Sequence, residues 1–227
     1  MIPGLETLYG VQEWATQYAH EPIQIDPWGG KDGHSFVAAF EGVMEIRAAQ
    51  ALYDVILKEA SLCANNGNSF AMVETGTSDG FTATVLAHAI RTAKANGKIW
   101  TGEINLLRSY KQPRPWPKLW QQYGLDSYIV SCVGDTRVES TWSAVYPPLP
   151  VELDALLIDS EHTEETVMAE FELLGRKVKK GGLILFHDVL LTHEYPGVAR
   201  AVDQISEILN SEPQFLDSCR GLALLKV

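Results

Sequence analysis

Residues 70–83 read Phe-Ala-Met-Val-Glu-Thr-Gly-Thr-Ser-Asp-Gly-Phe-Thr-Ala. The stretch begins with a short apolar run, which is typical of a buried β-strand. It continues through a turn bracketed by Gly76 and Gly80 into an alanine-rich segment that predicts a helix. Glycine leaves room for a ligand at the backbone, and the first N–H groups of the helix point into the same space. The pattern therefore predicts a nucleotide or carboxylate site at the carboxyl edge of a parallel sheet.

The spacing of the glycines distinguishes between two kinds of site. A dinucleotide-binding turn needs three glycines in the order G-x-G-x-x-G, whereas this turn has Gly76-x-x-x-Gly80 with Glu74 just before it. An acidic residue would repel a pyrophosphate, but it suits a cationic ligand such as the ammonium group of an amino acid. Thr82 and the helix N-terminus could take the carboxylate of that ligand. The alternative is an ordinary strand-to-helix turn of an α/β protein.

This turn resembles that of the class I S-adenosylmethionine-dependent methyltransferases. The resemblance implies that residues on both sides of the two glycines bind S-adenosylmethionine. The candidates are Glu74, Gly76, Thr77, Gly80, Phe81 and Thr82.

Length and charge limit the range of functions. The chain has 227 residues, which suits one domain or one domain with an appendage. It has no apolar run long enough to span a membrane and no signal-peptide pattern at its N-terminus, so we expect a cytoplasmic protein with no membrane partner. A formal net charge of -11 argues against nucleic acid as a partner, because a phosphate backbone requires a basic surface.

Strand and helix patterns alternate along the rest of the chain. Further strands are expected at residues 98–104, 128–133, 153–159 and 183–188, and two short strands at 213–216 and 221–226 would form a hairpin. This order predicts an α/β, Rossmann-like methyltransferase fold. Its mostly parallel seven-stranded sheet would end in a C-terminal antiparallel hairpin and carry helices on both faces.

We expect two parts in the chain. Residues 1–65 are predicted to form an N-terminal arm and a helix, from Phe36 to about Ala64, that cover the body. The arm is either core cover or a flap over a substrate pocket. Residues 66–227 are predicted to form the S-adenosylmethionine-binding methyltransferase domain. Residues 106–122 are basic and aromatic, and they form either a solvated connection or an edge that contacts substrate or partner.

Two further strand ends carry candidate cofactor ligands. Glu103 ends the second strand, where doubly wound sheets place a carboxylate on the hydroxyls of a ribose. In the methyltransferase pattern, the turn of Gly134 and Asp135 lies against the adenine, and Asp135 could accept a hydrogen bond from its amine. The alternatives are a solvated glutamate and a turn aspartate that bonds its own backbone.

A second polar cluster follows the fourth and fifth strands. Asp159 ends one buried apolar run, and His187 and Asp188 end the next. If these strands are neighbours in a parallel sheet, both ends meet at the edge that holds the glycine turn. Buried charged groups need a partner or a metal, and carboxylate-rich ligation suits magnesium or manganese.

The segment from Ile158 to Asp188 is similar to the metal-dependent O-methyltransferases, which include the catechol type, macrolide sugar O-methyltransferases and cephalosporin-hydroxylase-like proteins. The resemblance implies that Asp159 binds both metal and cofactor, that His162 is the general base, and that His187 and Asp188 bind metal. His187 stands where that family has an acidic residue. An unperturbed histidine is a suitable proton acceptor at neutral pH. The alternative for His162 is a residue of the turn before a helix.

The sequence thus predicts an S-adenosylmethionine-dependent methyltransferase that acts on a hydroxyl oxygen of a small molecule, with magnesium as a candidate second cofactor. A non-catalytic methyltransferase-like module that binds a ligand or partner protein is the alternative. A nicotinamide-dependent oxidoreductase fits less well, because the third glycine is missing. A homodimer is compatible with an N-terminal arm that docks on the body.

Overall fold

The structure, a computed structural model, describes residues 44, 46–78, 80–104, 120–121, 124–217 and 221–227. Most of the predicted N-terminal arm and of the basic aromatic segment therefore lies outside the described residues, and so does the start of the predicted helix at Phe36. The division of the chain at residue 65 remains a prediction.

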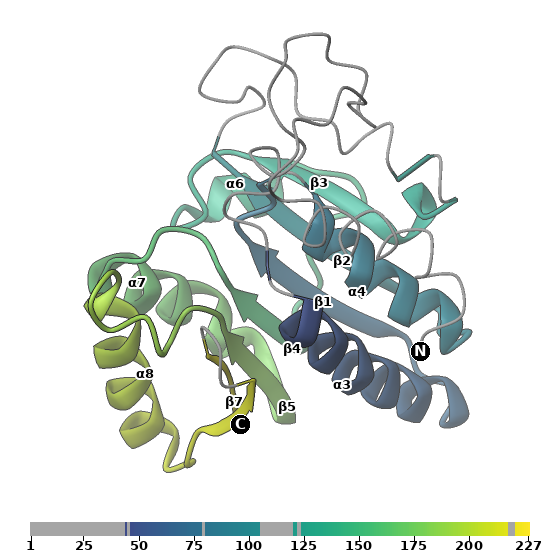
Figure 1. The fold of residues 1–227 in the computed structure, drawn as a ribbon. Helices are drawn as coiled ribbons and strands as arrows, with labels where there is room; N and C mark the ends of the chain where they lie inside the picture. Colours follow the sequence, from purple (N-terminus) through teal and green to yellow (C-terminus); the bar gives the residue numbers. More distant parts are fainter. Residues whose placement is uncertain (1–43, 45, 79, 105–119, 122–123, 218–220) are drawn as a thin grey trace, which may run out of the picture.

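The described chain alternates between strands and helices (Figure 1). Its first part comprises α3 (Ile46–Asn65), β1 (Phe70–Thr75), α4 (Phe81–Thr92), β2 (Gly97–Glu103), the 3-10 helix η1 (Asp126–Tyr128), β3 (Ile129–Val133) and α6 (Glu139–Ser143). Its second part comprises β4 (Leu153–Ile158), α7 (Glu164–Leu174), the 3-10 helix η2 (Gly175–Lys177), β5 (Val178–Phe186), α8 (Pro196–Leu209), β6 (Gln214–Asp217) and β7 (Leu222–Lys226).

The strands form one seven-stranded sheet in the order β3-β2-β1-β4-β5-β7-β6. β1 to β5 are parallel, and β7 runs antiparallel to both β5 and β6. The predicted fold is therefore confirmed, including the C-terminal antiparallel hairpin. The chain reverses direction of winding between β1 and β4, which is where doubly wound sheets bind ligands.

Helices cover both faces of the sheet (Figure 1). α3 and α4 pack against one face, where Leu52 and Leu86 join apolar side chains of β1, β4 and β5. α6, α7 and α8 pack against the other, where Trp142, Phe171 and Val202 join a second apolar cluster. β4 is buried at every position because both of its faces are covered, as its continuous apolar sequence predicts. No helix in the described part of the chain is long and apolar enough to cross a membrane.

The carboxyl ends of the central strands lie level with one another. Thr75 of β1 is in register with Gly102 of β2 and with Ile158 of β4, and Ile158 is in register with Phe186 of β5. The residues that follow these strands, which the sequence singled out, therefore emerge at one edge.

Candidate active site

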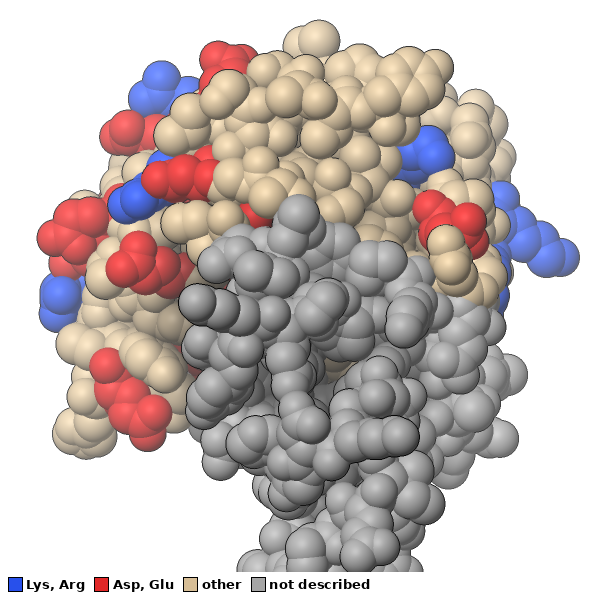
Figure 2. Space-filling model, turned by 90° about the horizontal axis from the view of Figure 1, so that it is seen from above, with Lys and Arg blue, Asp and Glu red and all other residues tan. Residues whose placement is uncertain are grey.

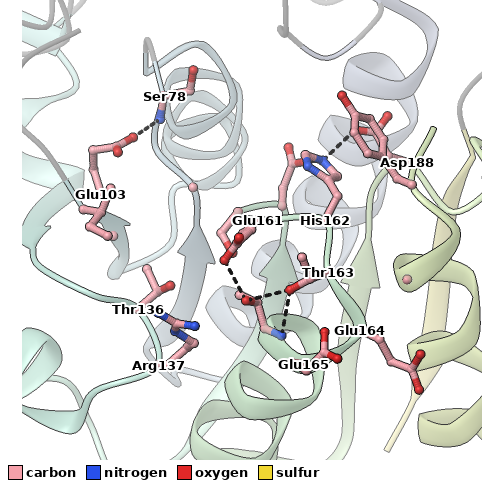
Figure 3. A pocket seen from close by; sticks show the side chains of 18 of the residues that line it. Ser78, Glu103, Thr136, Arg137, Glu161, His162, Thr163, Glu164, Glu165 and Asp188 are labelled. Carbon is pink, nitrogen blue, oxygen red and sulfur yellow. Dashed lines mark hydrogen bonds and ion pairs between the residues drawn. The ribbon is translucent and has the colours of Figure 1, made fainter. Parts of the chain in front are cut away.

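A cleft of about 870 Å³ opens at the carboxyl edge of the sheet. It lies over the ends of β1, β2 and β4 and extends to the start of α8 (Figure 3). Most of the predicted site residues line it. They are Gly76, Thr77, Phe81, Thr82, Glu103, Asp135, Asp159, His162 and Asp188. Glu74, Gly80, Gly134 and His187 are not among the lining residues.

Gly76 is required by a close approach of the protein's own backbone. Its φ is +85°, and a Cβ there would overlap the carbonyl oxygen of Asp159 and lie 2.8 Å from the Cα of Ser160. The sequence suggested that this glycine makes room for a ligand. The structure shows that it makes room for the segment after β4. Gly80 has a φ of 77° and caps the N-terminus of α4.

Glu103 is fixed beside the glycine turn. Its carboxylate accepts a hydrogen bond of 2.8 Å from the backbone N–H of Ser78, and the residue is 8% exposed (Figure 3). Thr82, in the first turn of α4, lies in the same part of the cleft lining. The carboxylate thus joins the end of β2 to the turn after β1.

Glu74 lies beneath the cleft floor. It is fully buried, and its Oε2 accepts a short hydrogen bond from the hydroxyl of Thr101. The Thr101 hydroxyl also bonds that of Thr77, 2.6 Å away, which lines the cleft. Burial raises the pKa of Glu74 to about 8 in spite of the bond from Thr101. Glu74 is therefore a neutral carboxylic acid at pH 7, linked to the cleft through two threonines.

Asp135 faces the cleft with its carboxylate already engaged. Both oxygens accept hydrogen bonds from the Arg137 side chain, at 2.8 and 2.7 Å, and the backbone N–H of Arg137 donates a third. These bonds lower the pKa of Asp135 to about 2. An amine of a ligand could therefore hydrogen-bond only to a carboxylate that is already paired with the Arg137 side chain.

The structure brings Asp159, His162 and Asp188 together. One ligand atom from each lies within 4.8 Å of the other two. The His162 Nε2 lies 2.8 Å from Asp188 Oδ2 and 3.9 Å from Asp159 Oδ1 (Figure 3). Burial opposes ionisation of Asp188, but hydrogen bonds from His162 and His187 outweigh it and hold its pKa below the usual range. Two carboxylate oxygens and an imidazole nitrogen are a donor set that a divalent cation accepts.

His187 lies beside the two carboxylates with which the sequence grouped it, and its role as a metal ligand stays a prediction. His187 is 4% exposed, and its Nδ1 lies 3.3 Å from Asp159 Oδ1 and 3.4 Å from Asp188 Oδ1. A protonated Nδ1 at this position attracts both carboxylates from the buried side of the cluster. Among the described residues, the group whose ligand atoms lie close enough to hold a metal is Asp159, His162 and Asp188.

Two residues of this region were missed by the sequence reasoning. Tyr195 stacks on the His162 ring, with centroids 4.2 Å apart and an interplanar angle of 23°. Glu170 is fully buried and bonds three hydroxyl groups beneath the cleft. Glu170 had a signal in the sequence, since it lies on the apolar stripe of Val167, Phe171 and Leu174. Tyr195 had no comparable signal.

A family model described as a methyltransferase domain matches residues 73–189, which is more than half of the chain. The chain therefore belongs to this methyltransferase family, and the resemblance to class I S-adenosylmethionine-dependent methyltransferases is confirmed. A comparison with curated protein sequences found no match.

Solved structures of O-methyltransferases share the fold. The enzyme TomG from Streptomyces achromogenes, in complex with SAM, is 13% identical, with a TM-score of 0.61 over 96% of both chains. An O-methyltransferase from Bacillus cereus in complex with SAH is 13% identical, with a TM-score of 0.62 over 98% of this chain and 100% of that one. NovP is 16% identical, with a TM-score of 0.56 over 78% of this chain and 79% of its own. At these identities the similarity concerns the fold.

Proposed function

We propose that the protein transfers a methyl group from S-adenosylmethionine to a hydroxyl oxygen of a small molecule. The observation that carries the proposal is the position of Asp159, His162 and Asp188 in the same cleft as the glycine turn and Glu103. A methyltransferase must place the acceptor oxygen beside the cofactor and remove its proton. The cleft offers residues for both tasks.

The cofactor half of the cleft is formed by the ends of β1 and β2. Glu103 takes the ribose hydroxyls, and the N-terminus of α4 with Thr82 takes the amino-acid carboxylate. S-Adenosylmethionine supplies an electrophilic methyl group on a sulfonium whose positive charge disappears on transfer. Asp159, which lies against Gly76, favours that positive charge before transfer.

The acceptor half is formed by the His162 region. The acceptor oxygen attacks the methyl carbon, the C–S bond breaks with its electrons going to sulfur, and the hydroxyl proton passes to the Nε2 of His162. After the transfer, the new Nε2–H can donate to Asp188 Oδ2, which lies 2.8 Å from that nitrogen, so this carboxylate stabilises the protonated ring. The stacked ring of Tyr195 limits its rotation. His162 is thus the proposed base.

In this proposal the carboxylates of Asp159 and Asp188 hold a divalent cation, with His187 behind them, and His162 acts as the base and not as the third ligand of the cluster. A bound Mg²⁺ would lower the pKa of the acceptor hydroxyl and fix its direction. A cation that engages the Asp188 carboxylate would leave the lone pair of His162 Nε2 available to accept the proton of the acceptor hydroxyl.

The test is a calorimetric titration of S-adenosylmethionine into EDTA-treated protein, repeated with Mg²⁺ and with NAD. We expect saturable binding of S-adenosylmethionine and none of NAD, followed by methyl transfer when a panel of sugars, phenols and polyketides is supplied. Binding without transfer to any hydroxyl would favour the non-catalytic alternative. Binding of NAD in place of S-adenosylmethionine would overturn the proposal.

A further inference from the structure

Glu170 joins the end of β1 to the segments that follow β3 and β4, and no strand ladder joins β3 to β4 directly. In the sheet order β3-β2-β1-β4, two strands separate the end of β3 from the end of β4. Glu170, on α7, accepts hydrogen bonds from Thr136 after β3, from Thr75 at the end of β1 (2.8 Å) and from Ser160 after β4 (2.6 Å). All three donors are side-chain hydroxyls that converge on one carboxylate.

The three segments are those that line the cleft. Thr136 and Ser160 are lining residues, and so are their neighbours Asp135 and Asp159. Thr75 is fully buried, and its backbone oxygen and hydroxyl both accept hydrogen bonds from the N–H of Asp159, at 3.2 and 3.3 Å. The carboxylate therefore sets the positions of Asp135 and Asp159 from below.

We propose that Glu170 is a positioning residue for the cofactor cleft. Through Thr75, Thr136 and Ser160, it fixes the part of the cleft floor that lies between the ends of β3 and β4. It does not line the cleft itself. Because Thr136 and Ser160 donate their hydroxyl protons to Glu170, their oxygen lone pairs are left for a ligand, so both act as acceptors toward the cleft. The effect on ligand binding rests on the proposed function, whereas the effect on the floor does not.

Two variants test the proposal. Glu170→Gln keeps the size of the side chain but replaces one acceptor oxygen with a donor. Thr75→Val removes one of the three hydroxyls at a residue that no ligand can touch, and it supplies the test if Glu170→Gln fails to fold. The matched control is Glu172→Gln, because Glu172 is an exposed residue of the same helix.

The first measurement is hydrogen exchange of the free protein. We expect Glu170→Gln and, more weakly, Thr75→Val to speed exchange in residues 134–137 and 159–162, while the strands and Glu172→Gln exchange as in the wild type. Unchanged exchange in both segments would overturn the proposal whether or not the protein binds S-adenosylmethionine.

The second measurement is calorimetric binding of S-adenosylmethionine. We expect Kd to rise about tenfold in Glu170→Gln with full stoichiometry, the loss expected for about one hydrogen bond. A purely structural role would lower the stoichiometry and the melting temperature but leave Kd unchanged, and that result would overturn the proposal. If the wild type does not bind the cofactor, the proposed function fails and the exchange result alone decides the role of Glu170.

Discussion

At the scale of single residues, two histidines near one pair of carboxylates have different surroundings. His162 faces the cleft and stacks on Tyr195, whereas His187 is buried against Asp159 and Asp188. The sequence placed all four polar residues at one edge, because parallel strands end together. It could not tell which imidazole would face solvent, since that depends on the path of the chain after each strand.

Replacement of His162 tests its role as base. We expect His162→Gln to lower kcat by roughly 10²–10⁴-fold, the usual contribution of a general base, with the Kd for Mg²⁺ nearly unchanged. Steady-state kinetics and metal titration measure the two quantities. His193→Gln, at an exposed histidine, is the control. A large rise in the Kd for Mg²⁺ with His162→Gln would make His162 a metal ligand instead.

The buried acid Glu74 predicts a pH dependence of stability. Its pKa is about 8 in the folded protein against an ordinary value of 4.5, so the folded state holds a proton that the unfolded state loses between these values. Its contribution to stability therefore falls as pH rises from about 4.5 to about 8, by roughly 1.4 kcal/mol per pH unit. Glu74→Gln should remove this slope.

Urea unfolding at pH 5, 6, 7 and 8 measures the effect. The stability of Glu74→Gln relative to the wild type should grow across the series, while Glu172→Gln should run parallel to the wild type. If the curves of Glu74→Gln and the wild type are parallel as well, Glu74 is ionised in the folded protein.

At the scale of elements, the sequence predicted the strand-to-helix turn after β1 but not the contact that requires its first glycine. The apolar run, the two glycines and the following helix are local features that a sequence displays. The approach of Asp159 to Gly76 is a contact between β1 and β4, which no local pattern displays. The same holds for Glu170, whose partners come from three separate segments.

The position of Gly76 gives a test at this scale. Gly76→Ala would combine a strained φ of +85° with overlap against Asp159. Gly181→Ala is a matched control, because Gly181 has a φ of +83° and no atom within 4 Å of the place that a methyl group would take. We expect Gly181→Ala to cost about 1–2 kcal/mol of unfolding free energy, the strain alone, and Gly76→Ala to cost more. Equal losses in chemical unfolding would mean that the approach of β4 does not constrain this turn.

At the scale of the whole molecule, the sequence was informative because a doubly wound sheet imposes its own geometry. Once the strands were recognised, their carboxyl ends had to meet at the turn of Gly76, and the cleft followed. The identity of the acceptor depends on side chains brought from several loops. Residues 1–43 and 105–119, which carry the predicted arm and most of the basic aromatic segment, lie outside the described structure.

Ligand binding should stabilise the whole domain. We expect S-adenosylmethionine at about 100 times its Kd to add roughly 2.7 kcal/mol to the unfolding free energy, because it binds only the folded cleft. Thermal unfolding measures the shift, with NAD as the control ligand. Addition of Mg²⁺ should raise the midpoint temperature of unfolding further. EDTA should then remove the increase due to Mg²⁺ and leave the increase due to S-adenosylmethionine. Equal shifts with NAD would contradict the assignment of the cleft.

The described lining of the cleft has more carboxylates than arginines. In the view of Figure 2, uncharged residues form most of the described surface, and Asp and Glu side chains lie in several small groups with Lys and Arg among them. The two arginines of this lining, Arg137 and Arg200, are each bonded to a carboxylate of the lining. Apart from His162, the other acidic and basic side chains of that described lining are carboxylates. They are Glu103, Asp159, Glu161, Glu165, Asp188 and Glu194.

This excess of carboxylates has a consequence for turnover. The proposed methyl donor enters with a sulfonium cation, and the product S-adenosylhomocysteine leaves without it. An acidic cleft attracts the cationic S-adenosylmethionine more strongly than S-adenosylhomocysteine. Methyl transfer therefore removes part of the electrostatic attraction between the cleft and the bound cofactor. Product departure should then be fast relative to release of unreacted donor, and added salt should narrow the difference between the two rates.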